Sequence, residues 1–307
     1  MTLRKLSLTV LSLVLLGALA VFALGPRRVF VAGKSRLQRG WLIMNGGLVD
    51  VGGHRLRVEH FGNGSQTVVF ETGLAQPRTT WGRVPGEVAT FAQVVIYDRA
   101  GLGESYAVNN RRTSKQIVAE LHAMLKNADF KPPFILVGHS FGGLNARMFA
   151  SQFPDEVAGI VLVDASHEDE YNRLAALMSE PKRNEYLRHE GGGNFERVDL
   201  LASAEEVRTA AALKEMPFIV ISASESPEKQ NEQSTAKPPC LEGASDIRDC
   251  FDPRIALIHN EMQSSLARLV PNGSMIVAEN SGHFVQWDRP ELVISAIRKM
   301  VEQVQAR

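Results

Sequence analysis

A short apolar run in the middle of the chain leads into a glycine-rich turn, and a helix-forming segment follows at once. Residues 134–137 read Phe-Ile-Leu-Val, residues 138–143 read Gly-His-Ser-Phe-Gly-Gly, and residues 144–153 suit a helix. A Gly-x-Ser-x-Gly turn is so tight that only glycines leave room two positions from the serine. Ser140 would then lie at a helix N-terminus, where amides and the helix dipole favour negative charge. This context predicts a strand, a strained turn and a helix, with Ser140 as a candidate nucleophile.

Further short β-branched runs alternate with helical segments from about residue 45 onward. Residues 47–51 and 54–61 flank a Gly-Gly pair and predict a β-hairpin. Short continuous apolar runs are typical of strands covered on both faces of a parallel sheet. The alternation predicts an α/β fold, with a mostly parallel central sheet and helices on both faces. The buried strand candidates are residues 67–70, 94–97, 134–137, 160–163, 218–221 and 275–278.

Two helices and two insertions complete the expected domain, residues 45–307. Ser114 is a candidate N-cap for one apolar stripe, and residues 292–304 repeat the same spacing after Pro290. Residues 166–216 are polar and helix-forming and are too long for a loop, so we interpret them as a helical cap. Residues 223–252 are rich in proline and predict a second, irregular insertion.

The N-terminal residues 1–44 predict a signal or membrane anchor followed by a linker. Residues 6–24 carry no charge and follow Arg4 and Lys5. As a helix they would extend about 28 Å, enough to cross a hydrocarbon layer of roughly 30 Å. A basic start before an apolar stretch is also typical of a secretory signal, with Ala-Leu-Ala at residues 18–20 as a cleavage site. We therefore expect a membrane-anchored or exported protein, on the periplasmic or extracellular side, with the membrane as a partner if the segment is retained.

The charge balance and the cysteine count exclude other classes. Lys plus Arg and Asp plus Glu number 34 each, so clustered positive charge for nucleic acid is not expected. No metal motif or phosphate loop is present in the sequence, and we expect no cofactor. Cys240 and Cys250 frame a short polar loop and favour a disulfide in an oxidising compartment, with two free thiols as the alternative.

Four motifs together resemble the α/β-hydrolase fold superfamily, in its serine esterase or lipase branch. They are ETGL at 71–74, DRAGLGES at 98–105, GHSFGG at 138–143 and NSGHF at 280–284, and the resemblance covers residue 47 to the C-terminus. It implies that Ser140 is the acyl nucleophile and His283 its catalytic base. His139 is expected to pack beside the turn, and His167 to lie at the entrance of the cap. The resemblance implies a structural role for the DRAGLGES loop.

The acid of the implied Ser-His-acid triad has two candidates. The usual family position follows the strand at 218–221, where the first carboxylate is Glu225. The other family position follows the preceding strand, where Asp164 stands directly after Ile-Val-Leu-Val. Either carboxylate can orient a histidine and stabilise its imidazolium form. We favour Asp164 as the acid, with Glu225 as the alternative.

The expected oxyanion hole consists of two backbone N–H groups. Phe141 supplies one as the residue after the nucleophile, and by family position Leu74 supplies the other. We therefore expect a serine hydrolase that cleaves a carboxylic ester or related acyl bond of a small molecule through an acyl-enzyme. Two alternatives remain: the same triad acting on a lactone, amide or carbon–carbon bond, and a non-catalytic ligand-binding homologue.

Overall fold

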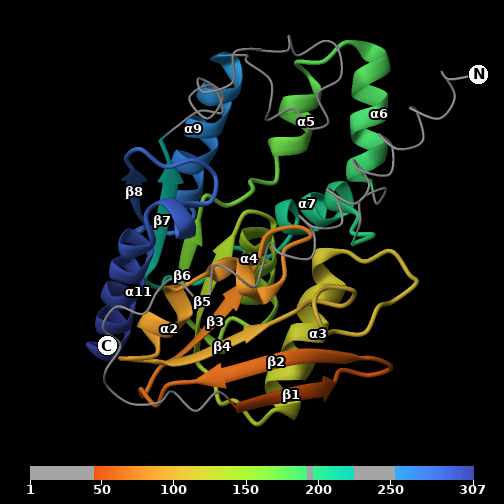
Figure 1. Ribbon diagram of the computed structural model, residues 1–307. Helices are drawn as coiled ribbons and strands as arrows, with labels where there is room; N and C mark the ends of the chain where they lie inside the picture. Colours follow the sequence, from red (N-terminus) through yellow and green to blue (C-terminus); the bar gives the residue numbers. More distant parts are fainter. Residues whose placement is uncertain (1–44, 192–195, 225–252) are drawn as a thin grey trace, which may run out of the picture. The chain divides into compact units, whose positions relative to one another are not determined.

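In the part of the chain that the structure describes, a mixed sheet of eight strands in the order β1-β2-β4-β3-β5-β6-β7-β8 forms the centre of the fold (Figure 1). The computed structural model describes residues 45–191, 196–224 and 253–307, all within the unit Leu42–Arg307. The strands are β1 (Asn45–Asp50), β2 (Arg55–Phe61), β3 (Thr67–Glu71), β4 (Gln93–Tyr97), β5 (Phe134–His139), β6 (Val157–Val163), β7 (Phe218–Ala223) and β8 (Ser274–Ala278).

Antiparallel pairing is confined to one end of the sheet. β1 pairs with β2 as a hairpin, and β2 pairs antiparallel with β4. The hairpin turn uses Gly52 and Gly53 at φ 95° and 110°, a backbone region that glycine adopts without steric cost. All remaining pairs are parallel. The predicted hairpin and the predicted mostly parallel sheet are both confirmed.

Helices cover both faces of the sheet. α3, α4 and α7 pack together on one face, and α2 packs with α11 on the other (Figure 1). The helices are η1 (Arg78–Trp81), α2 (Val84–Val88), α3 (Ser114–Asn127), α4 (Phe141–Gln152), α5 (Glu170–Ala175), α6 (Glu180–Glu190), α7 (Leu200–Arg208), α9 (Pro253–Ala267), α10 (Val285–Asp288) and α11 (Pro290–Gln305).

Two hydrophobic cores result, one on each face of the sheet. Side chains alternate along a strand, so Phe134 and Leu136 of β5 enter one core while Ile135 and Val137 enter the other. Each fully buried side chain of this size contributes about 1.5–3 kcal/mol through removal from water. The continuous apolar run in the sequence is therefore explained by burial on both faces.

Two details differ from the sequence prediction. Thr113, not Ser114, is the N-cap of α3, and its N–H donates to Oε1 of Gln116 at 2.9 Å. The hydroxyl of Ser114 instead donates to Asn145. β8 was expected to be buried on both faces, but Met275 and Val277 are 41% and 44% exposed. β8 is the last strand of the sheet, and its alternate residues face away from the core.

Helices α5, α6 and α7 lie between β6 and β7, in the region where a helical cap was expected. The N-terminal segment 1–44, most of the insertion 223–252, and both cysteines lie outside the described residues. Within the ranges that the structure describes, no helix has the length and apolar character needed to cross a membrane.

Candidate active site

The turn between β5 and α4 places Ser140 in a conformation that few residues adopt. Its backbone has φ 52° and ψ −125°, a strained combination for a residue with a side chain. A Cβ at Gly138 would lie 2.6 Å from the carbonyl oxygen of Gly142, and one at Gly142 only 2.3 Å from the carbonyl oxygen of Glu71. Both glycines of the motif are therefore required by sterics, as the sequence indicates.

Hydrogen bonds on both sides hold this turn in place. The N–H of Ser140 donates to the carbonyl of Val163 at 3.2 Å. Its own carbonyl accepts from the amides of Gly143 and Ser166, at 2.9 and 3.0 Å. Val163 and Ser166 flank Asp164, so the ends of β5 and β6 are tied together at the carboxyl edge of the sheet.

Asp164 and His283 meet at this edge although 119 residues separate them. Nδ1 of His283 lies 2.7 Å from Oδ2 of Asp164, whose side chain is only 4% exposed. The other oxygen, Oδ1, accepts the amide of Ala223 at 2.8 Å. Burial raises the pKa of Asp164, but the neighbouring His259 and His283 outweigh it and hold that pKa well below its usual range. Asp164 is therefore a carboxylate at neutral pH.

His139 connects the loop of His283 to the loop after β3. Its Nε2 donates to the carbonyl of His283 at 2.9 Å, and its Nδ1 lies 3.1 Å from Oε1 of Gln76. The rings of His139 and His283 lie 4.7 Å apart between centroids. The sequence predicted only packing for His139. Its two polar partners were not predicted, because they belong to loops that are distant in the chain. The contact brings the loop of His283 beside the residue that precedes Ser140.

A buried arginine forms hydrogen bonds to the loop that contains Leu74. Arg99, 1% exposed, donates to the carbonyls of Thr72 and Gly73 at 2.7 and 2.6 Å. Gln76 accepts the amide of Gly73 at 3.2 Å. These bonds fix the backbone that precedes Leu74, at the peptide groups of Thr72 and Gly73.

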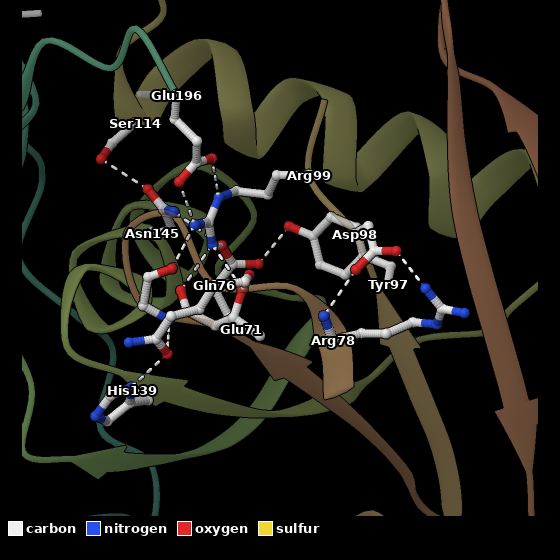
Figure 2. A network of polar contacts seen from close by, with 12 residues as sticks. Glu71, Gln76, Arg78, Tyr97, Asp98, Arg99, Ser114, His139, Asn145 and Glu196 are labelled. Carbon is white, nitrogen blue, oxygen red and sulfur yellow. Dashed lines mark hydrogen bonds and ion pairs between the residues drawn. The ribbon is translucent and has the colours of Figure 1, made fainter. Parts of the chain in front are cut away.

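Glu196 completes this network from the region between β6 and β7 (Figure 2). Its two oxygens accept from Nε and one terminal nitrogen of Arg99, at 2.9 and 2.8 Å, and its Oε2 also accepts the amide of Ala75 at 2.6 Å. Glu71 binds Arg99 at 2.9 Å and Asn145 at 2.8 Å, and accepts the hydroxyl of Tyr97. Two carboxylates thus form ion pairs with one buried guanidinium.

The pKa values in this network follow from its charges. Burial lowers the pKa of Arg99, but Glu196 and Glu71 more than offset it, so the arginine stays charged. Burial, reinforced by Glu71, holds the pKa of Tyr97 well above its usual value. The family resemblance implies a structural role for the loop of Asp98 and Arg99. In the structure, Asp98 accepts the amides of Arg78 and Glu104.

Phe141 is the first residue of α4, and its side chain is 1% exposed. The guanidinium of Arg99 lies 5.4 Å from the centroid of its ring, so the same arginine contacts both loops of the expected oxyanion hole. The amide of Phe141 belongs to the first turn of α4, where backbone N–H groups lack partners within the helix.

The sequence alone indicates no role for His259, Asn145 or Glu196. His259 is a residue of α9, and its Nε2 lies 3.0 Å from Oδ1 of Asp164. No local motif marks these residues, because their partners lie far away in the chain.

His167 is buried, and its Nδ1 accepts the amide of Asp169 at 3.0 Å. Glu225, the alternative acid, lies outside the described residues. Within the described ranges, no group of three His, Cys, Asp or Glu residues has an arrangement that could hold a metal ion.

The mostly parallel sheet, the strained serine turn at its carboxyl edge and the histidine–carboxylate pair at the same edge are typical of an α/β-hydrolase. The chain belongs to the alpha/beta hydrolase family, whose model matches residues 68–296. Among its relatives is the uncharacterized protein YqjL of Bacillus subtilis, 26% identical over 239 residues, which span 77% of this chain and 83% of that protein. An AB hydrolase superfamily protein of Gibberella zeae is 23% identical over 286 residues, with 77% and 86% covered.

Among solved structures, the fold is similar to that of a thermophilic esterase from Thermogutta terrifontis, with a TM-score of 0.56 and 18% identity. The match covers 85% of this chain and 99% of the esterase. At this identity the likeness shows the fold. The family membership supports a hydrolytic enzyme.

Proposed function

We propose that this protein is a serine hydrolase that cleaves a carboxylic ester or a related acyl bond through an acyl-enzyme. The observation that supports it most is the 2.7 Å contact between Nδ1 of His283 and Oδ2 of Asp164, beside the turn of Ser140. A carboxylate at Nδ1 keeps the proton of the neutral imidazole on that nitrogen and leaves the lone pair on Nε2. His283 is thereby prepared to act as a base.

In the first half of the reaction, Oγ of Ser140 attacks the acyl carbon while Nε2 of His283 takes the hydroxyl proton. The carbonyl electron pair moves onto oxygen and gives a tetrahedral oxyanion. When this intermediate collapses, the bond to the leaving group breaks, and His283 gives its proton to the departing alcohol. Asp164 stabilises the imidazolium throughout and does not itself change protonation.

In the second half, water attacks the acyl-enzyme, and Nε2 of His283 takes one of its protons. Collapse of the second tetrahedral intermediate breaks the bond between the acyl carbon and Oγ, and the proton returns to Ser140. The products are a carboxylic acid and free enzyme. No cofactor is needed in either half.

The amides of Leu74 and Phe141 would hold the oxyanion. The stabilisation that these amides give to the oxyanion depends on their rigid placement, because donors that need not reorganise stabilise developing charge most strongly. The bonds from Arg99 to Thr72 and Gly73 support this role for the loop of Leu74. The ring contact between Arg99 and Phe141 supports it for the other loop.

Residues 166–216 would act as a cap that selects the acyl group and controls access. Two contacts favour this proposal. Glu196 reaches from this region to the loop of Leu74, and His167 lies 3.4 Å from the hydroxyl of Ser265 in α9. Changes of cap residues that face the substrate are expected to alter chain-length preference more than turnover of the shortest ester.

A panel of p-nitrophenyl esters with acyl chains of increasing length tests the proposed activity, with the Ser140→Ala variant as control. We expect turnover of at least one ester by the parent and none above background by the variant. Turnover of lactones or amides but of no ester would favour the alternative substrates. A folded parent inactive on every acyl substrate would favour a non-catalytic binding protein.

We also propose export or membrane tethering, on the basis of the uncharged residues 6–24. Fractionation of cells that express the full chain tests this point. Recovery in the membrane or exported fraction supports it, and recovery only in the cytosol with an intact N-terminus contradicts it.

A further inference from the structure

The carboxylate of Asp164 is contacted by two histidines, one on each oxygen. His283 approaches Oδ2 at 2.7 Å, while Nε2 of His259 lies 3.0 Å from Oδ1. The contact of His259 is a close ion pair rather than an aligned hydrogen bond. The same oxygen, Oδ1, also accepts the amide of Ala223 at 2.8 Å. A Ser-His-Asp triad requires only the first of these histidines. The second therefore requires its own explanation.

The position of His259 follows from the anchoring of α9. One helical turn further on, Nε2 of Gln263 donates to the carbonyl of Ala165 at 2.7 Å, next to Asp164 in the chain. Residues four apart lie on the same face of a helix, so this bond directs the face with His259 toward the end of β6. α9 also packs on β7 and β8, which fixes the helix against the sheet.

The charges around His259 favour its protonated form. Burial alone lowers the pKa of His259, but Asp164 outweighs it, and with a smaller contribution from Glu170 raises that pKa to about 9. α5 supplies Glu170 and also Arg173, which binds Glu261 on α9 itself. The segment before α5 supplies His167, whose pKa is lowered by burial. The strands β7 and β8, Phe218–Ala223 and Ser274–Ala278, carry no ionisable side chain.

We propose that His259 is a positioning residue of the triad: as an imidazolium it holds Oδ1 of Asp164, keeps Oδ2 directed at His283, and opposes a second positive charge beside the carboxylate. The proposal rests on the proposed function of Asp164 and His283. A positive charge behind the carboxylate partly cancels its field at His283, so protonation of His283 becomes less favourable.

Two substitutions separate the charge from the contact. His259→Gln keeps a polar N–H group near Oδ1 but carries no charge, and we expect the acid-side midpoint of kcat/KM to rise by about one pH unit. His259→Leu removes both, and we expect the same shift together with a fall in kcat of about tenfold or more, because Oδ2 loses its orientation.

His122→Gln is the matched control. Nε2 of His122 lies 3.1 Å from Oε1 of Glu156, and its side chain is 27% exposed against 30% for His259. Both are helical histidines paired with one carboxylate, but Glu156 follows α4 and is not part of the triad. We expect the pH profile of this variant to match that of the parent.

NMR titration of the full chain labelled at histidine gives a readout that does not require turnover. We expect His259 of the parent to titrate well above pH 6.5, and the midpoint of His283 to rise in His259→Gln but not in His122→Gln. A midpoint of His259 at or below 6.5, or an unchanged midpoint of His283 in the folded His259→Gln variant, would overturn the proposal. If the shift occurs while the parent cleaves no ester, the coupling of the histidines stands and the proposed function falls.

Discussion

The guanidinium of Arg99 and the carboxylate of Glu196 form a bidentate pair across 97 residues of sequence, with distances of 2.9 and 2.8 Å. Both side chains are buried, and Glu196 also accepts the amide of Ala75 (Figure 2). The pair therefore connects the region between β6 and β7 to the loop of the expected oxyanion hole. Removing one charge of such a pair leaves the other buried with less compensation.

Glu196→Gln tests this connection. We expect the free energy of unfolding to fall by about 3–5 kcal/mol, the usual effect of breaking a buried pair. We also expect a lower kcat, because the amide of Ala75 and the loop of Leu74 lose part of their support. Urea unfolding and initial rates measure the two effects.

Glu205→Gln is the control, because Glu205 pairs with Arg208 at 3.0 Å but is 62% exposed. It should change the free energy of unfolding by no more than about 1 kcal/mol. Equal effects of the two substitutions would contradict the account of the network.

Asp164→Asn separates the two candidate acids. An amide at this position can no longer fix the tautomer of His283 or stabilise its imidazolium, so we expect kcat to fall about 10³- to 10⁴-fold with the fold retained. Glu225→Gln should leave kcat within a few-fold of the parent. Initial rates and circular dichroism of both variants check this, and the reverse ranking would make Glu225 the acid.

The strained backbone of Ser140 predicts a conflict between stability and activity. Its φ of 52° suits glycine better than any residue with a Cβ. We expect Ser140→Gly to exceed Ser140→Ala in free energy of unfolding by about 1 kcal/mol, while neither variant has activity. Thermal and urea unfolding of the two variants gives the difference. A Gly variant less stable than the Ala variant would mean that the turn carries no strain.

The raised pKa of His259 also predicts how stability depends on pH. A group whose pKa rises on folding contributes its full stabilisation at pH values below its pKa in the unfolded state, about 6.5. It loses this contribution as the pH passes its pKa in the folded state, which is about 9 for His259. The parent should therefore be more stable than His259→Gln at pH 6, and this difference should shrink by pH 9.5. Urea unfolding at both values measures it, and a constant difference would contradict the ion pair.

The sequence alone predicts structure that depends on a local pattern. The turn of Ser140 follows from adjacent residues, because a strand, two glycines and a helix are all encoded within a short stretch. The positions of Asp164 and His283 after strands could also be predicted, since the carboxyl ends of parallel strands meet at one edge. In the structure, the two side chains meet at this edge, with 2.7 Å between Nδ1 of His283 and Oδ2 of Asp164.

Residues that act through distant partners could not be predicted. Glu196 follows a run of glycines in a polar stretch, where a carboxylate is most often solvated, and only the fold brings it to Arg99. His259 lies on an amphipathic helix without a motif, and its significance arises from Asp164 alone. Ser114 was misassigned as an N-cap because Thr113 has the same capping chemistry one residue earlier.

Covalent labelling of the full chain by a fluorophosphonate, located by mass spectrometry, tests the central claim most directly. The reagent reacts only with an activated serine, so we expect label on Ser140 in the parent and none in Ser140→Ala. Labelling should be much slower in Asp164→Asn, because His283 loses its orienting partner. Folded parent protein that takes up no label, or label on another serine, would contradict the assignment of Ser140 as the nucleophile.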